Sequence, residues 1–230
     1  LQYPNAQIIA TTKERNPNNY LPASRIQLFN ECDKIAIPYM NISTELQSKF
    51  SNPIHTCMIP YDIDLLYDLF YKDERTESIL IGSNRWAPNR GLQETLSFAN
   101  TINHIYPDLL IESRTNYKEQ SDTMLYDWLE YNSRFSFCFN LDGPEQFCGQ
   151  VGIQCAVLGV IQIGGVTESS EYLFPETSGL DPHKLLPIFS ELYNDVDKRN
   201  ILITKAWSRV NKLYSFPAVK QQILNIYEAH

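Results

Sequence analysis

Short apolar runs alternate with amphipathic stretches along most of this 230-residue chain. A short apolar run is typical of a buried strand, and apolar residues three or four positions apart are typical of a helix that packs on a sheet. In the first part of the chain the pattern predicts strands at 6–11, 34–38 and 55–59, and helices at 25–31 (capped by Ser24) and from Ser43 or Thr44 to Phe50. Strands separated by helices indicate βαβ units and a parallel sheet.

The same pattern resumes at residue 78. It predicts strands at 78–82, 109–112, 135–140 and 160–163, and helices at 91–105, 124–131, 149–158, 185–193, 197–212 and 218–229. Gly159 stands where a left-handed glycine commonly ends a helix. The expected buried face of the helix at 91–105 carries Leu92, Leu96, Ala99, Ile102 and Ile105.

Residues 60–77 interrupt this alternation. Pro60 opens the stretch, and aspartate, tyrosine and leucine residues follow it, which fits a connection containing one short helix. The sequence therefore predicts three parts: a partial, Rossmann-like N-terminal lobe at 1–59, an interdomain linker at 60–77 and a C-terminal domain at 78–230.

Composition and charge narrow the class of protein. Hydrophobic residues make up 43% of the chain and charged residues 20%, enough apolar side chains to bury a core. The formal net charge of -8 disfavours a nucleic-acid partner, which usually meets a basic face. No stretch approaches the ~20 apolar residues of a membrane-spanning helix. No signal peptide is recognised, and Leu1, which is not a Met and lies close to a strand, suggests a trimmed or partial chain. We expect a cytoplasmic protein, because its cysteines are typical of reduced thiols.

The cysteines and histidines do not favour a metal site. The five cysteines have no CxxC spacing, and most lie in apolar surroundings, which is typical of reduced, buried thiols more than of disulfides or metal ligands. The four histidines are scattered, with no HExxH pattern. We expect no bound metal.

Ligands of parallel α/β sheets bind at the carboxyl ends of the strands, so three loops are the candidates for chemistry: 83–90, 140–149 and 164–170. The first loop carries Arg85 and Arg90, just before a helix. Guanidinium groups and helix N-termini both favour phosphate oxygens. The alternative is a pair of solvated surface arginines.

The second loop feeds an apolar helix and contains Gly143 and Gly149, which permit a close backbone approach. Its acidic candidates are Asp142 and Glu145, and Gln146 is a polar one. An ordinary turn with a helix cap explains these residues equally well.

The third loop contains Gly164, Gly165 and Glu168 after a buried strand. Paired glycines let a ligand lie against backbone amides, but a flexible turn that leads into a helix has the same composition. The chain has no GxGxxG after a strand, no GxxxxGK[ST] and no GxSxG, which disfavours a dinucleotide-binding domain, a P-loop and an α/β-hydrolase.

Taken in order, five segments resemble the GT-B glycosyltransferase superfamily, particularly its retaining, group-1-like branch. These segments are 32–38 (CDKIAIP), 59–64 (IPYDID, followed by Phe70), 82–91, 142–159 and 160–168. Arg85 matches the arginine of the family's "GRL…KG" loop, and Arg90 replaces its lysine. The stretch at 214–227 is similar to the family's closing helix, so the resemblance covers the chain from residue 32 onward.

The resemblance implies an α/β fold of GT-B type: Rossmann-like parallel sheets flanked by helices, with a partial first lobe. In this family the second lobe, here 78–230, binds the nucleotide sugar, and the first binds the acceptor. The residues that the resemblance assigns to the donor are Gly82, Gln146, Gly149, Gln154, Gly164, Gly165 and Glu168. The residues that it assigns to catalysis are Arg85, Arg90 and Glu145.

Gln154 stands where the family has the second of its two glutamates. An amide still hydrogen-bonds to a ribose hydroxyl but carries no charge. Counting back from Gln154, the first glutamate position falls on Gln146, with Glu145 one place away. Either side chain is then expected to contact the donor sugar.

The expected activity is transfer of a hexose from a nucleoside-diphosphate sugar, which is a substrate, with no cofactor and no metal. Retention of the anomeric configuration and a role in polysaccharide or glycan biosynthesis are implied by the resemblance. The expected partners are the nucleotide sugar and a glycan, lipid-linked or protein acceptor, without nucleic acid. Peripheral membrane association through a missing N-terminal part stays open.

Two other functions are open. The chain could be a non-catalytic lobe that binds a nucleotide sugar or pairs with an active chain, which Gln154 and the short first lobe favour. It could also be an unrelated doubly wound domain, such as a sugar epimerase. That class should show paired carboxylates or a histidine at the cleft, whereas the histidines here lie outside the three loops.

Overall fold

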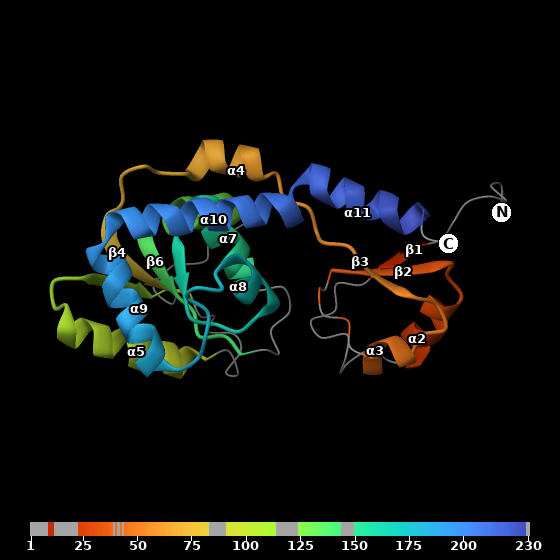
Figure 1. The fold of residues 1–230 in the computed structure, drawn as a ribbon, viewed down its shortest axis with the longest axis horizontal. Helices are drawn as coiled ribbons and strands as arrows, with labels where there is room; N and C mark the ends of the chain where they lie inside the picture. The colour runs from red at the N-terminus through yellow and green to blue at the C-terminus, as the bar shows by residue number, and fades with distance from the viewer. Residues whose placement is uncertain are drawn as a thin grey trace. The chain divides into compact units, whose positions relative to one another are not determined.

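The computed structural model describes residues 9–11, 23–38, 40, 42, 44–82, 91–113, 124–143 and 150–228. The chain divides into two compact units. The first comprises Leu1–Tyr61 and Lys212–His230, and the second comprises Asp62–Asn211. The chain therefore passes into the second unit after Tyr61 and returns to the first after Asn211, as the colours of Figure 1 show.

The described part of the first unit holds a parallel sheet in which β1 (Ile9–Thr11), β2 (Lys34–Ile37) and β3 (Ile54–Thr56) lie in that order. The helices α2 (Ala23–Asn30) and α3 (Thr44–Ser48) precede β2 and β3. The side chains that form its core are Phe29, Ile35, Ile37, Leu46, Phe50 and Ile54. The predicted alternation of strand and helix is confirmed here.

The helix α11 (Phe216–Glu228) packs within the first unit. The Met58 N–H donates to Gln222 Oε1 at 2.8 Å, and Lys34 Nζ donates to the Tyr227 carbonyl at 3.0 Å. Figure 1 shows α11 above the sheet of this unit, with α2 and α3 below it. The side chains that α11 buries are Val219 and Ile226.

This arrangement differs from the domain bounds expected from the sequence. The expected C-terminal domain at 78–230 included residues 212–228, which the structure groups with the first unit. The buried face of α11 is the physical reason, because an amphipathic helix is stable where its apolar side is covered. The expected linker at 60–77 contains α4 (Ile63–Phe70), capped by Asp62, and runs into the second unit's first strand.

The second unit holds a parallel sheet with the order β5-β4-β6-β7 among its described strands. The bounds of these strands are β4 (Thr76–Ile81), β5 (Leu110–Ser113), β6 (Phe135–Phe139) and β7 (Ile161–Ile163). The helices that follow α4 are α5 (Leu92–Ile105), α6 (Met124–Asn132), α7 (Gln150–Leu158), α8 (Glu168–Leu173), α9 (Pro182–Asn194) and α10 (Val196–Tyr214).

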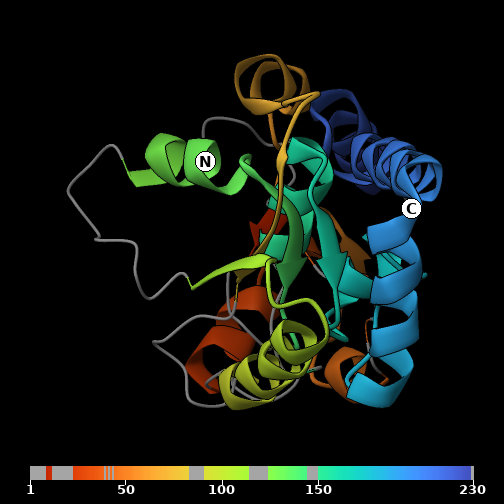
Figure 2. The ribbon, with the colours of Figure 1, turned by 90° about the vertical axis from the view of Figure 1, so that its left-hand side faces the viewer.

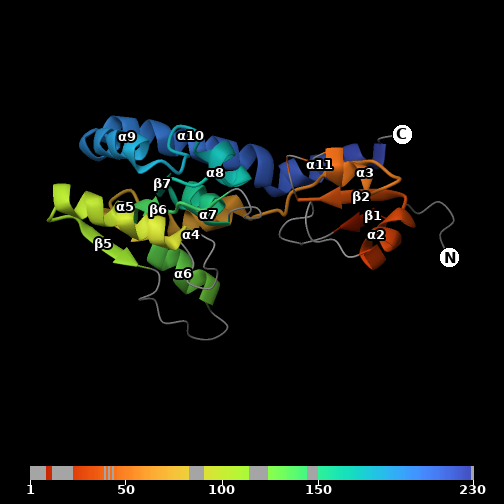
Figure 3. The same cartoon turned by 90° about the horizontal axis from the view of Figure 1, so that it is seen from below.

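Side chains of β6 alternate between the two faces of this sheet, as the period of a strand requires. The ring centroids of Phe137 and Phe139 lie 5.1 and 5.3 Å from the ring centroid of Phe189 in α9. Cys138 points to the other face, where it lies next to Cys155 of α7. Figures 2 and 3 show α9 and α6 on opposite sides of the sheet. Both faces are thus covered, as is usual for parallel sheets.

Two local predictions were wrong. The buried residues of α5 are Thr95, Phe98, Ala99 and Ile102, whereas Ile105 is 49% exposed. A threonine can be buried there because its hydroxyl finds hydrogen-bond partners inside the unit. Ser24, expected to cap a helix, lies inside α2, which begins one residue earlier.

Candidate functional site

The carboxyl ends of β4, β6 and β7 meet at one edge of the second unit's sheet, because the three strands are parallel neighbours. Backbone hydrogen bonds continue past the strands. The Gly82 N–H donates to the Phe139 carbonyl at 2.9 Å, and the Asn140 N–H donates to the Ile163 carbonyl at 3.1 Å. This carboxyl edge therefore aligns the starts of the three loops that the sequence marked as candidates.

Gly164 and Gly165, which we call the glycine turn, follow β7 with φ angles of +90° and +83°. Both angles lie in the left-handed region that side chains disfavour. A Cβ atom at Gly165 would lie 2.8 Å from the Asn140 carbonyl oxygen, and one at Gly164 would lie 2.8 Å from Leu141 Cδ1. The glycines are thus required for the turn to pack against the chain that follows β6.

The side chain of Gln162, fully buried in β7, holds the glycine turn from inside. Its Nε2 donates to the Gly164 carbonyl at 3.1 Å and to Ser170 Oγ at 2.8 Å. Ser170 Oγ also hydrogen-bonds to Thr167 Oγ1 at 2.7 Å, where Thr167 caps α8. A buried polar network with these partners makes one turn conformation strongly preferred.

Asn140 and Asp142, directly after β6, are buried polar residues of the carboxyl edge, 1% and 5% exposed. Asn140 Nδ2 donates to Asp142 Oδ2 at 3.2 Å. The Val166 N–H donates to the Asp142 carbonyl at 2.9 Å, which ties this loop to the segment after the glycine turn. Asp142 is therefore a candidate site residue that the family resemblance does not assign, although its position in the second loop marked it as an acidic candidate.

The start of α5 also reaches the carboxyl edge. Gly91 has a φ angle of +60°, and a Cβ atom there would lie 2.0 Å from the Leu141 carbonyl oxygen. Thr95 Oγ1 donates to the Gly91 carbonyl at 2.7 Å and accepts from the Leu141 N–H at 3.1 Å. The beginning of this helix, where backbone N–H groups favour anions, therefore lies beside the loop after β6.

Of the residues assigned from the sequence, the structure describes five. Gly82, Gly164 and Gly165 lie together along the carboxyl edge. Glu168 is the first residue of α8, directly after the capping Thr167. Gln154 lies within α7, where its Oε1 accepts from Trp128 Nε1 at 3.0 Å. The residues that fall outside the described part of the chain are Arg85, Arg90, Glu145, Gln146 and Gly149.

Gln162 and Asn140 could have been found from the sequence by their position. Gln162 is a polar residue inside the apolar run at 160–163, and Asn140 stands at the end of an aromatic strand. A polar side chain at such a place is usually buried with a specific hydrogen-bond partner. Thr177, whose hydroxyl donates to the Gln162 carbonyl, carried no comparable signal, because this contact joins residues that are 15 positions apart in the chain.

The Cys155 thiol next to this edge is unsuited to nucleophilic chemistry. A hydrogen bond with Cys138, together with burial, raises the pKa of Cys155 well above its usual range. A thiolate is therefore strongly disfavoured there. Cys138 also lies against Gly82, where a Cβ atom would be 2.6 Å from its sulfur. Both cysteines fill space beneath the edge.

Among the residues that the structure describes, no three histidine, cysteine, aspartate or glutamate side chains gather as a metal site would require. No described helix combines the length and the hydropathy needed to cross a membrane.

No protein-family model matches this chain, and no curated protein matches its sequence. Solved structures, however, match its fold along nearly all its length. The GtfA/B complex matches with a TM-score of 0.66 and 11% identity, over 97% of this chain and 53% of the other. This chain therefore spans about half the length of the matched GtfA/B chain.

Two further structures match over a larger share of their own length. An alpha-glucosyltransferase in complex with UDP-glucose and DNA containing an abasic site has a TM-score of 0.64 and 10% identity, over 98% of this chain and 73% of the other. A glycosyltransferase from Rickettsia africae ESF-5 has a TM-score of 0.63 and 14% identity, over 99% and 71%. At these identities the likeness establishes the fold: the α/β fold of GT-B type that the sequence predicted is confirmed.

Proposed function

We propose that this chain carries the nucleotide-sugar site of a glycosyltransferase and helps to move a sugar from a nucleoside-diphosphate donor to an acceptor hydroxyl. The observation that carries the proposal is the carboxyl edge of the second unit, where Gly82, Asp142 and the glycine turn meet. In α/β folds this is the edge at which ligands bind. The GT-B fold of this chain is shared with glycosyltransferases, among them one in complex with UDP-glucose.

In the proposed reaction the acceptor oxygen bonds to the anomeric carbon, and the bond from that carbon to the diphosphate oxygen breaks. The bonding electrons stay on the diphosphate, and the acceptor proton passes to a base. Arg85 and Arg90 are assigned to the charge that grows on the diphosphate, because preorganised cations at a developing charge are usually a large catalytic effect. The contact of Gly91 with the loop after β6 supports this assignment, since Gly91 directly follows Arg90.

The remaining assignments concern the bound donor. Glu145 or Gln146 would contact sugar hydroxyls, and Gln154 would hydrogen-bond to the ribose. The glycine turn and Glu168 would face the sugar and phosphate groups, where Gly82 and Gly149 allow a close approach. The buried network around Gln162 supports this part of the proposal, because a preorganised turn loses little freedom when a ligand binds.

We further propose that the reaction needs no metal ion, because the two arginines and the start of α5 would supply the positive charge. For the acceptor we propose a glycan, a lipid-linked sugar or a protein, in glycan or polysaccharide biosynthesis in the cytoplasm. One similar structure, the alpha-glucosyltransferase, contains DNA. The net charge of -8 on this chain favours a different acceptor, since phosphate backbones bind basic surfaces.

A second candidate function is nucleotide-sugar binding without catalysis, in a lobe that pairs with an active chain. The observation that favours it is the hydrogen bond from Trp128 to Gln154 Oε1, which takes one of the two lone pairs of the oxygen assigned to the ribose. Two of the similar structures are complexes, of GtfA/B and of the Gap123 proteins from Streptococcus agalactiae.

The first test is a thermal-unfolding screen of the whole chain against UDP-, GDP- and ADP-sugars. A ligand present at 100 times its Kd adds about 2.7 kcal/mol of stability, which a shift in the unfolding midpoint reveals. Stabilisation followed by measurable transfer or hydrolysis supports the enzyme. Stabilisation without turnover supports the non-catalytic lobe, and no stabilisation by any donor contradicts both.

The second test concerns the arginines. We expect Arg85→Ala and Arg90→Ala each to lower the turnover rate at least tenfold without changing the unfolding midpoint, because each removes a cation from the leaving group. Arg134→Ala is the matched control, since Arg134 is exposed at the opposite, amino end of β6. Wild-type turnover in both loop variants would remove the role assigned to them.

A further inference from the structure

The segment after α8, residues 174–179, holds the glycine turn from its outer side. The Gly164 N–H donates to the Thr177 carbonyl at 2.8 Å, and the Gly179 N–H donates to the Gly165 carbonyl at 2.9 Å. Thr177 is 1% exposed, and its hydroxyl donates to the Gln162 carbonyl. Each glycine of the turn is therefore bonded to this bracing segment (residues 174–179), so a movement of the segment would move the turn.

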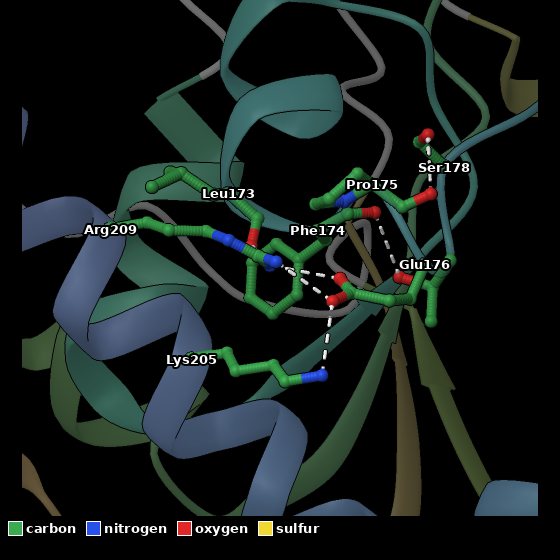
Figure 4. A network of polar contacts seen from close by, with 8 residues as sticks. Leu173, Phe174, Pro175, Glu176, Ser178, Lys205 and Arg209 are labelled. Carbon is green, nitrogen blue, oxygen red and sulfur yellow. Dashed lines mark hydrogen bonds and ion pairs between the residues drawn. The ribbon is translucent and has the colours of Figure 1, made fainter.

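The bracing segment is fixed in turn by α10, through an ion pair that Figure 4 shows. Arg209 Nη2 lies 2.8 Å from Glu176 Oε1, and Arg209 Nη1 lies 2.9 Å from Glu176 Oε2. Nη1 also donates to the Leu173 carbonyl at 3.0 Å, at the end of α8. Lys205 Nζ lies 3.7 Å from Glu176 Oε1. The planar guanidinium thus fixes both the direction and the position of the Glu176 carboxylate.

Glu176 and Thr177 are consecutive, so the ion pair acts one residue away from the carbonyl that Gly164 binds. The electrostatic surroundings favour the charged form of Glu176. The hydrogen bond from Arg209 lowers the pKa of this carboxyl, and Lys205 lowers it further. The carboxylate is therefore charged at neutral pH. The path from α10 to the turn runs through three described contacts: Arg209 to Glu176, Thr177 to Gly164, and Gly179 to Gly165.

A second ion pair of the same helix provides a comparison. Arg199 Nη2 lies 3.0 Å from Glu77 Oε1 near the start of β4, at the amino end of the sheet. Arg199 and Arg209 are separated by about 15 Å along α10, at 1.5 Å per residue. Both pairs hold α10, but Glu176 directly precedes Thr177, which bonds to the glycine turn, whereas Glu77 lies at the opposite end of the sheet.

We propose that Glu176 and Arg209 are positioning residues for the donor site, which hold the glycine turn in its binding conformation through the bracing segment. This role rests on the proposed function of the turn in donor binding. Neither side chain is assigned a contact with the substrate. The pair acts by keeping the Thr177 carbonyl in place for the Gly164 N–H and the Gly179 N–H in place for the Gly165 carbonyl.

The first experiment needs no ligand. Hydrogen–deuterium exchange of the whole chain is measured for the wild type, Glu176→Gln and the matched control Glu77→Gln. We expect peptides spanning 162–168 to exchange about three- to fivefold faster in E176Q only, because partly exposed pairs contribute modestly. Equal exchange of this segment in E176Q and the wild type, or equal acceleration in E176Q and E77Q, would overturn the proposal.

The second experiment links the pair to the donor. With the nucleotide sugar that stabilises the wild type most, we expect E176Q to raise KM about fivefold and to leave kcat within about twofold, the pattern of lost ground-state binding. Arg209→Lys should recover part of the affinity that Arg209→Ala loses, because lysine keeps the positive charge but cannot donate two parallel hydrogen bonds to the carboxylate. An unchanged KM in E176Q, with faster exchange at 162–168, would overturn the donor role. Absence of any donor binding by the wild type would instead contradict the proposed function, and the exchange experiment would still decide the bracing role.

Discussion

The two ends of the second unit's sheet are built from different chemistry. At the amino end, Arg75 precedes β4, and its guanidinium donates to the carbonyls of Leu158 and Gly159, just before β7. The guanidinium also lies over the Tyr71 ring, 5.0 Å from its centroid. The Arg75 guanidinium thus provides donors for carbonyls at the end of α7 that have no partner within the helix. Charged side chains thus connect the elements at this end.

At the carboxyl end, the connections are made mainly by backbone groups and neutral side chains, with the buried Asp142 carboxylate hydrogen-bonded to Asn140. The glycine turn packs against Asn140 and Leu141 at distances that exclude a Cβ atom, and Gln162 holds it from inside. The ion pair of this end, between Glu176 and Arg209, lies outside the turn and acts through the bracing segment. The difference suggests that the amino end mainly stabilises the fold, while the carboxyl end keeps close backbone packing for a ligand. The following predictions test this division.

The largest effect is expected for Gly165→Ala. The left-handed φ angle costs about 1–2 kcal/mol, and a Cβ 2.8 Å from a backbone oxygen adds the cost of overpacking, so the free energy of unfolding should fall by about 2–4 kcal/mol in urea. Donor affinity should fall at least tenfold. Gly143→Ala is the control, because no heavy atom of the described residues lies within 4 Å of a Cβ there and its φ is not positive; it should change stability by less than about 0.5 kcal/mol. Equal stability of the two variants would show that the turn tolerates a side chain.

A smaller effect, of a different kind, is expected for Arg75→Met. This substitution keeps the aliphatic stem but leaves two carbonyls at the end of α7 without their charged donor, which should lower the free energy of unfolding by about 2 kcal/mol. Donor affinity of the folded variant, measured by calorimetric titration, should stay within about twofold of the wild type. Arg134→Met, at an exposed arginine, serves as the control. A tenfold loss of affinity in R75M would remove the division between the two ends.

The smallest effect is the pH dependence of the Glu176 pair. The hydrogen bond from Arg209, together with Lys205, lowers the pKa of Glu176 in the folded protein, although burial opposes this. A carboxylate whose folded pKa is depressed stabilises the fold above its unfolded pKa and loses that contribution as the pH falls. The difference in unfolding free energy between wild type and E176Q should thus be under about 1 kcal/mol at pH 7 and shrink as the pH falls from about 5 to about 3. Urea unfolding of both proteins across this range measures it. A difference that stays constant or grows on acidification would contradict the charge-based link.

Much of the element order could be read from the chain, because hydrophobic periodicity reflects the local environment of each segment. The apolar runs at 78–82 and 135–140 correspond to β4 and β6, and the predicted helix at 149–158 corresponds to α7. Gly159 ends that helix with a φ of +70°, as predicted. The short helix α8 was not predicted, because its hydrophobic pattern is brief and its buried residues include two serines.

In the candidate site, the sequence predicted the positions only of residues that directly follow a buried strand. Gly82, Gly164 and Gly165 were placed at the correct edge, because a residue after a buried parallel strand must lie there. The ribose assignment of Gln154 and the sugar and phosphate assignment of Glu168 stay predictions, as do the roles of Arg85, Arg90, Glu145, Gln146 and Gly149. The partnership of Gln154 with Trp128 could not be inferred, since it joins two helices whose packing no local pattern specifies.

By itself, the sequence determined the α/β class, the order of most strands and helices and the loops in which polar residues follow buried strands. These properties depend on spacing over a few residues, which a single chain displays directly. The tertiary structure alone decided that α11 completes the first unit, that Thr177 meets Gly164 and that Arg209 meets Glu176. Those pairings join segments far apart in the chain, and their free energy comes from packing and hydrogen bonding that exist only once the elements have assembled.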